Sequence, residues 1–288
     1  MTYPATSPRS LASRSAADHG PRQGDDYRPG VRILVTNDDG VEAPGLRALA
    51  QALVDDGHDV VVVAPDGERS GAGGAIGWLH RSGPISHQEV EWPELPDVPV
   101  HALGTQPAAT VYAGGFGAFG PPPELVASGV NRGLNTGHLV LHSGTVGAAL
   151  TAAVLGIPAV AVSVAWGDDE YWATAARLAA AAVPCLVDGA GTVLSLNVPN
   201  VPLEEVLGVR AGRLHPFDEC WVAETSPAEL VLRYEGHAGE PDPDTDIGLV
   251  RAGYASATLL TGITGVPAVA AAAAITAAAG LGATTRGR

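Results

Sequence analysis

The chain has 288 residues, enough to bury a substantial core as one large α/β domain with additions. Its formal net charge of −15 argues against binding to nucleic-acid polymers, because a phosphate backbone requires a basic surface. A small phosphorylated substrate stays compatible with this charge, since a metal ion and backbone amides can meet it. Two cysteines are too few for a disulfide framework, so we expect a reduced, cytoplasmic setting.

The two ends of the chain are expected to lie outside the globular core. Residues 1–30 are rich in Ser, Arg, Ala, Pro and Gly and lack the apolar run of a signal peptide, which predicts a disordered extension. Residues 263–288 are predicted to form an alanine-rich terminal helix and tail. Their apolar stretch, 268–279, is shorter than the about 20 residues of a membrane span. We therefore expect no membrane segment.

The first elements predict a strand, a turn and a helix. The apolar run 33–35 ends in Asn37-Asp38-Asp39-Gly40, and Pro44 opens an amphipathic segment that Gly57 stops. A second buried strand over 60–64 leads into a glycine-rich loop that contains Ser70. A βαβ unit makes its two strands parallel, so we expect Ser70 at the same sheet edge as the two aspartates.

The later chain continues the alternation of strands and helices. We interpret 75–100 as a hairpin or excursion and expect the region beyond about 205 to be a hairpin or arm. The pattern predicts strands over 100–103, 125–128, 159–163 and 193–198, and helices over 143–155 and 171–183.

The predicted fold is α/β: a Rossmann-like, mostly parallel sheet with helices on both faces, plus a C-terminal β-hairpin or arm and a terminal helix. We expect the catalytic core over 31–205 and a hairpin or oligomerisation segment over 206–262. Four polar or glycine-rich loops then follow strand ends, at 37–40, 69–74, 131–133 and 143–145. Such loops meet at one rim of an open α/β sheet, which is where this architecture binds ligands.

Each loop also has a purely structural interpretation. Asp38-Asp39 is compatible with an ordinary turn, Ser70 with a turn serine, and Asn131 with a left-handed turn residue. Ser143-Gly144-Thr145 is compatible with a helix cap alone. Four such loops in this order are nevertheless more consistent with a single site.

The chain resembles the SurE survival-protein family of metal-dependent nucleoside monophosphate phosphatases. The motifs that carry the resemblance are RILVTNDDGVEAPGLRAL (32–49), VVVAPDGERSGAG (61–73), VASGVNRGLNTG (126–137), HSGTVGAAL (142–150), GIPAVAVS (156–163) and, more weakly, DTDIGLVRAGYASATLL (244–260). The resemblance implies a phosphoric monoester hydrolase that acts on a small phosphorylated substrate.

The resemblance also implies roles for individual residues. One divalent metal per subunit, Mg²⁺ or Mn²⁺, would be held by Asp38, Asp39, Ser70 and Asn131, all of which offer hard oxygen ligands. One of the two aspartates is the candidate general base. The substrate and its phosphate would be bound by the loop before the predicted helix and by nearby side chains: Ser143, Gly144, Thr145, Asn37, Asn135 and His142.

The sequence departs from the family pattern in two places. Residues 104–110 lack the family's acidic residue, and His138 and His142 stand near the place of acidic residues and a tyrosine. These differences affect the expected substrate preference, because the four metal ligands are present. We expect both histidines to lie on the surface or to line the pocket, since the local glycine and leucine content argues against a helix that would pair them on a metal.

Two other functions are weighed against the phosphatase. A Rossmann-like glycosyl or nucleotidyl transferase also begins with a strand, a glycine-rich loop and a helix, but it would not need the aspartate pair. A non-catalytic homologue would bind phosphate esters without hydrolysing them. Late segments of SurE-like proteins contribute to subunit contacts, so we expect a homodimer or homotetramer.

Overall fold

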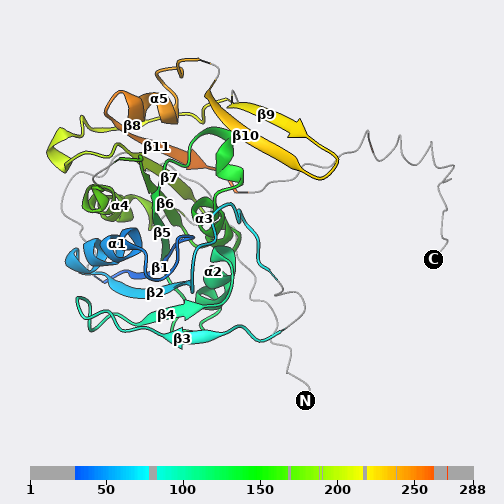
Figure 1. Ribbon diagram of the computed structural model, residues 1–288. Helices are drawn as coiled ribbons and strands as arrows, with labels where there is room; N and C mark the ends of the chain where they lie inside the picture. The colour runs from blue at the N-terminus through cyan, green and yellow to red at the C-terminus, as the bar shows by residue number, and fades with distance from the viewer. Residues whose placement is uncertain are drawn as a thin grey trace, which may run out of the picture.

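In the computed structural model, a nine-stranded sheet forms the centre of the protein (Figure 1). The structure describes residues 30–77, 83–167, 170–187, 189, 191–216, 219–237, 239–262 and 271. The strand order is β3-β4-β2-β1-β5-β6-β7-β11-β8, and β4, β2, β1, β5, β6 and β7 are mutually parallel. The mostly parallel α/β sheet predicted from the sequence is therefore confirmed.

The six parallel strands match the apolar runs of the sequence. Their bounds are β1 Arg32–Thr36, β2 Asp59–Pro65, β4 Val100–Leu103, β5 Leu125–Arg132, β6 Ala159–Val164 and β7 Val193–Val198. The short edge strand β3, His87–Glu89, pairs antiparallel with β4, as expected for an excursion within 75–100. β5 is longer than the predicted 125–128 and extends through Asn131.

Helices cover both faces of the sheet (Figure 1). One face packs against α1 (Pro44–Asp55) and α4 (Trp172–Leu186), and the other against α2 (Pro107–Gly115) and α3 (Gly144–Val154). The sequence did not predict α2. Six of its nine residues are buried and its apolar residues do not follow one stripe, so it lacks the amphipathic signal of a surface helix.

After a short 3-10 helix, Leu203–Glu205, two later strands join the central sheet. β8 (Val209–Ala211) pairs with β11 (Ala255–Leu260), and β11 pairs antiparallel with β7. A short helix, α5 (Asp246–Arg251), precedes β11.

β9 (Glu219–Thr225) and β10 (Leu230–His237) form a separate two-stranded antiparallel hairpin that projects from the body (Figure 1). The hairpin expected in this region is present.

The predictions for the two ends of the chain fall on residues 1–29, 263–270 and 272–288, which lie outside the described residues. Within the part of the chain that the structure describes, no helix is both long enough and apolar enough to cross a membrane.

The order of the sheet decides where a ligand can bind. The connections run outward in opposite directions from β1 and β5, which lie side by side, so the strand order reverses between them. Open α/β sheets bind ligands outside the carboxyl ends of the strands at such a switch point. The turn after β1 and the end of β5, with Asp38, Asp39 and Asn131, meet at this place.

Candidate active site

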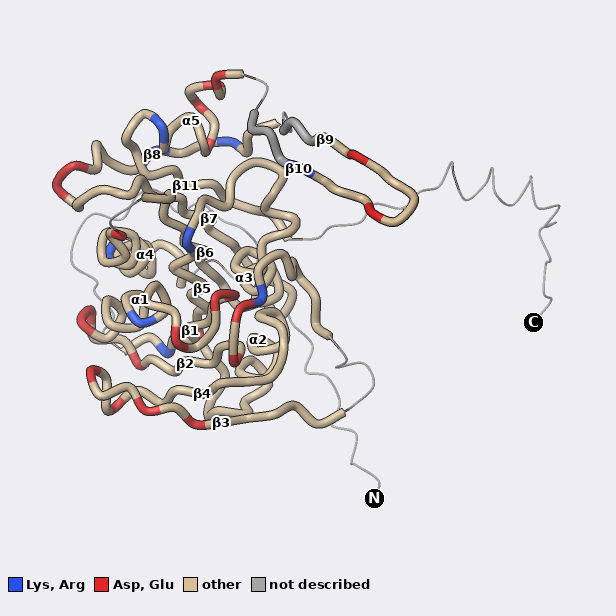
Figure 2. Tube along the Cα trace, in the orientation of Figure 1, with Lys and Arg blue, Asp and Glu red and all other residues tan. Residues whose placement is uncertain are grey.

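The turn after β1 presents the two aspartates at the switch point. Asn37 is fully buried, and its side chain closes the turn: Nδ2 donates to the Gly40 carbonyl at 3.0 Å, and Oδ1 accepts from the Gly40 amide at 3.2 Å. The structure thus gives Asn37 a role in shaping the turn. Figure 2 shows acidic segments on the loops that follow β1 and β2.

Asp38 lies against the N-terminus of α3. Its carboxylate accepts hydrogen bonds from the Thr145 hydroxyl and from the backbone amides of Thr145 and Gly144. A Cβ at residue 144 would lie 2.7 Å from Oδ2 of Asp38, so only glycine fits there. Burial raises the pKa of Asp38, and these hydrogen bonds partly oppose the rise. The positive end of the helix dipole favours the charged form at this position.

Asp39 is the more accessible carboxylate of the pair. Burial raises its pKa from 3.8 to about 7, with further contributions from the negative charges of Asp38 and Glu68. The backbone N–H of Arg132 donates to this carboxylate, which lowers the pKa in part. The protein therefore holds two neighbouring carboxylates whose charges its own groups do not fully balance.

The loop that carries Ser70 contacts the aspartate turn directly. The Arg69 amide donates to the Asp38 carbonyl at 2.7 Å, and the Gly73 amide donates to the His142 carbonyl at 3.0 Å. These two bonds attach the loop both to the turn after β1 and to the segment before α3. The Ser70 side chain is exposed and its hydroxyl donates to Glu68.

The end of β5 places Asn131 in the same region. Its Nδ2 donates to the Gly133 carbonyl at 2.7 Å, which leaves the amide oxygen as the atom available for a metal ion. Asn135 is held by the neighbouring strands: its Nδ2 donates to Ser163 Oγ at 2.9 Å, and its backbone exchanges two hydrogen bonds with the Asn197 side chain. Asn135 therefore fixes the loop after β5.

The segment before α3 contains the two histidines. A 3-10 helix, Gly137–Leu141, includes His138, and His142 follows it with an exposed side chain. Ser143 caps α3, its hydroxyl accepting from the Val146 amide at 3.1 Å.

Asp246 is a functional candidate that the sequence did not single out. Its side chain is fully buried and accepts hydrogen bonds from the backbone amides of Gly137 at 2.7 Å, His215 at 3.0 Å and Ile247 at 2.9 Å. The first of these bonds ties the loop between Asn135 and His142 to α5. The residue lies within the late motif 244–260, which was the only signal for it in the sequence.

The donor set fits a hard divalent cation. Among the described residues, no group of three or more His, Cys, Asp or Glu side chains is placed to hold a metal, so two carboxylates must be supplemented by neutral oxygens. Ser70 and Asn131 supply such oxygens on adjoining loops. A bound cation would offset the burial that raises both aspartate pKa values and the repulsion from Asp38 and Glu68 that adds to the rise at Asp39.

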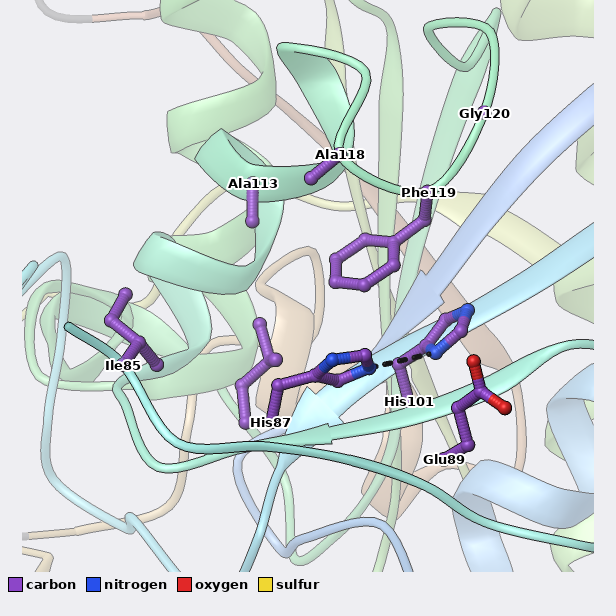
Figure 3. A pocket seen from close by; sticks show the side chains of 9 residues that line it. Ile85, His87, Glu89, His101, Ala113, Ala118, Phe119 and Gly120 are labelled. Atoms are coloured by element: carbon purple, nitrogen blue, oxygen red, sulfur yellow. Dashed lines mark hydrogen bonds between the residues drawn. The ribbon is translucent and has the colours of Figure 1, made fainter.

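A cavity of about 480 Å³ opens at the β3 edge of the sheet, and none of the candidate active-site residues lines it (Figure 3). His87 and His101 face each other in it, with Nε2 and Nδ1 3.1 Å apart, and the Phe119 ring stacks on His101 at 4.3 Å. The candidate active site is therefore not the largest hollow of the protein.

The family described as Survival protein SurE matches residues 33–218, more than half of the chain. The chain belongs to the SurE family. The match includes both aspartates, Ser70, Asn131 and the start of α3.

Relatives within the SurE family are similar over most of their length. The "5'/3'-nucleotidase SurE" of Photorhabdus laumondii is 38% identical over 238 residues, which cover 80% of this chain and 89% of the relative. The "5'-nucleotidase SurE" of Xanthomonas campestris is 38% identical over 240 residues, covering 79% of this chain and 88% of the relative.

The crystal structure of the SurE protein from Aquifex aeolicus has a similar fold. The TM-score is 0.70 at 28% identity, and the alignment covers 86% of this chain and 99% of that chain. The resemblance to SurE proteins inferred from the sequence motifs is thus confirmed at the level of both sequence and fold.

Proposed function

We propose that this SurE-family chain is a metal-dependent phosphomonoesterase that hydrolyses nucleoside monophosphates or a related small phosphate ester. The observation that carries the proposal is the pair of buried Asp38 and half-buried Asp39 at the switch point of the sheet, in contact with the loops of Ser70 and Asn131. The names of the relatives, which are nucleotidases, support the same reaction and substrate class.

One Mg²⁺ or Mn²⁺ ion per subunit would be held by Asp38, Asp39, Ser70 and Asn131. When bound, such an ion polarises a phosphoryl oxygen and orients a water molecule for attack. The preference for Mg²⁺ or Mn²⁺ over other metals rests on the all-oxygen donor set, which disfavours zinc and other metals that prefer nitrogen or sulfur.

Other steps of the reaction are assigned to side chains and backbone groups of the protein. Asp38 is buried and fixed by three donors from α3, whereas Asp39 receives the Arg132 amide and is the more accessible carboxylate. We therefore assign Asp39 as the general base, its carboxylate oxygen accepting a proton from the attacking water. Residues 143–145 at the N-terminus of α3 would bind the phosphate, whose charge the helix dipole favours. His142, directly before this segment, would contact the substrate.

The proposal is tested by assaying nucleoside monophosphates with added Mn²⁺ or Mg²⁺. Hydrolysis should require the metal and stop with a chelator, and Asp38→Asn should lower kcat by about a hundredfold or more. Asp97→Asn, an exposed carboxylate on the loop before β4, is the matched control and should keep full activity. Binding of nucleotide without hydrolysis would instead favour a non-catalytic homologue, and activity retained in Asp38→Asn would contradict the metal assignment.

Family membership argues against the glycosyl or nucleotidyl transferase weighed above.

We also propose a cytoplasmic homodimer or homotetramer in which residues 206–262 form subunit contacts. On β10, Leu230, Val231 and Leu232 are 63%, 46% and 62% exposed, an apolar strip that a second subunit would cover. Light scattering of the full chain at micromolar concentration tests this assembly, and a monomer would refute it.

A further inference from the structure

A second hollow adjoins Asp39 on the side facing α1 and α4. It has a volume of about 250 Å³ and is lined by the start of α1 and by side chains from β5, α4 and the loop before α4: Ala43, Pro44, Arg132, Glu170 and Trp172, with Asp39 at one end. A substrate whose phosphate lies at the aspartates would therefore have this hollow beside it.

The polar wall of this hollow is preorganised. Glu170 forms an ion pair with Nε of Arg132 at 2.5 Å and accepts from the indole N–H of Trp172 at 2.9 Å. The Trp172 ring packs over Gly45, where a Cβ would lie 2.9 Å from the ring carbons. Arg132 and Trp172 thus hold the Glu170 carboxylate in place, so the carboxylate does not have to reorganise before a ligand enters.

Arg132 also contacts an aromatic ring. Its guanidinium lies 4.7 Å from the centre of the Trp166 ring, and that ring is 68% exposed. A guanidinium carries five N–H donors in a planar fork, and the ion pair to Glu170 is made through Nε. The terminal nitrogens are therefore the donors that a ligand in the hollow would meet.

The charge of the hollow restricts what it can accept. Two carboxylates, Asp39 and Glu170, face one guanidinium, so a further phosphate or carboxylate on the ligand would be repelled. Apolar contacts from Ala43, Pro44 and Trp172 suit the faces of a ring system. Glu170 and Arg132 suit its hydroxyl and amide edges.

We propose that this hollow is the leaving-group subsite, which receives the uncharged sugar and base of a nucleoside monophosphate. Arg132 and Glu170 are its specificity-determining residues. This inference rests on the proposed phosphomonoesterase function and goes beyond it, because it names the surface that distinguishes a nucleoside ester from other phosphate esters.

The test compares two substrates that share a phosphate and differ in the leaving group, a nucleoside 5′-monophosphate and glycerol 3-phosphate, with Mn²⁺ present. Arg132→Ala and Glu170→Gln should each lower the ratio of kcat/KM for the nucleotide over that for glycerol phosphate by about tenfold, mainly through KM. Arg210→Ala is the matched control, since Arg210 also stacks on an aromatic ring, at 3.6 Å from Tyr254, but on β8. It should leave the ratio unchanged.

Direct binding supplies a readout that needs no turnover. Adenosine or guanosine alone should bind the metal-free protein in calorimetry, and Glu170→Gln should weaken that binding by about tenfold. Glu170→Gln keeps the size of the side chain, so we expect circular dichroism to show an intact fold. The binding test can then rest on Glu170→Gln alone if Arg132→Ala does not fold.

The outcomes separate the two proposals. If both variants slow both substrates equally, Arg132 and Glu170 act on the phosphate side and the subsite assignment is wrong. If neither variant changes the ratio, the hollow is empty during turnover and the assignment is also wrong. If the wild type hydrolyses neither ester, the proposed function fails, and nucleoside binding still decides whether the hollow accepts a nucleoside.

Discussion

Replacing Asp39 with asparagine should stabilise the metal-free protein at pH 8. Burial and the charges of Asp38 and Glu68 raise the pKa of Asp39 from 3.8 to about 7, so the ionised carboxylate is disfavoured in the folded state. Asparagine removes the charge and keeps an oxygen that accepts from the Arg132 amide. The folded protein then no longer bears the cost of this buried charge.

The magnitude follows from the pKa difference. At about 1.36 kcal/mol per pKa unit, a change from 3.8 to about 7 means that ionised Asp39 lowers the free energy of unfolding of the wild type by at most about 4 kcal/mol. Solvent reaches part of the carboxylate and screens its charge, so we expect about 1–2 kcal/mol. The folded state binds the carboxyl proton of Asp39 more tightly than the unfolded state does. The wild-type protein is therefore stabilised by this proton at low pH, and it loses that stabilisation as the pH rises from about 4 through about 7.

The assay is urea unfolding of wild type and Asp39→Asn in chelator at pH 5 and pH 8, repeated with excess Mn²⁺. The stabilisation by asparagine should be larger at pH 8 than at pH 5. The increase in wild-type stability on adding Mn²⁺ should be much smaller in the variant, because a metal stabilises only the state that binds it. An Asp39→Asn variant that is less stable than wild type at pH 8 in chelator would refute this account, and Asp97→Asn controls for a general charge effect.

Two further substitutions test the segment around the start of α3. Thr145→Val removes the hydroxyl that donates to Asp38, so metal affinity measured by titration should fall by about tenfold along with activity; an unchanged metal affinity would show that this hydrogen bond does not position the carboxylate. His142→Tyr should change the profile over a panel of phosphate monoesters, since it replaces an exposed imidazole directly before the N-terminus of α3. Identical profiles would remove His142 from the substrate path.

The sequence alone determined the elements whose signal is local. Short apolar runs gave the parallel strands, because a strand buried on both faces needs apolar side chains at nearly every position. Asn37 to Gly40 marked the first turn, and Ser143 marked the start of α3, because turn and cap residues act through hydrogen bonds to their own neighbourhood. The α2 helix was not predicted, because its burial on nearly all sides removes the helical periodicity.

Only the tertiary structure decided what the site residues do. Thr145 donates to Asp38 across 107 residues of sequence, and Gly137 is bound by Asp246 across 109. The pKa of Asp39 depends on burial, on the charge of its neighbour Asp38 and on the charge of Glu68 in the loop after β2. Arg132 lies in a sequence motif but Glu170 and Trp172 do not, and the three form one wall only because β5 and α4 pack beside α1. Local propensity carries no information about such contacts, because burial and Coulomb energy depend on distance in space rather than on separation along the chain.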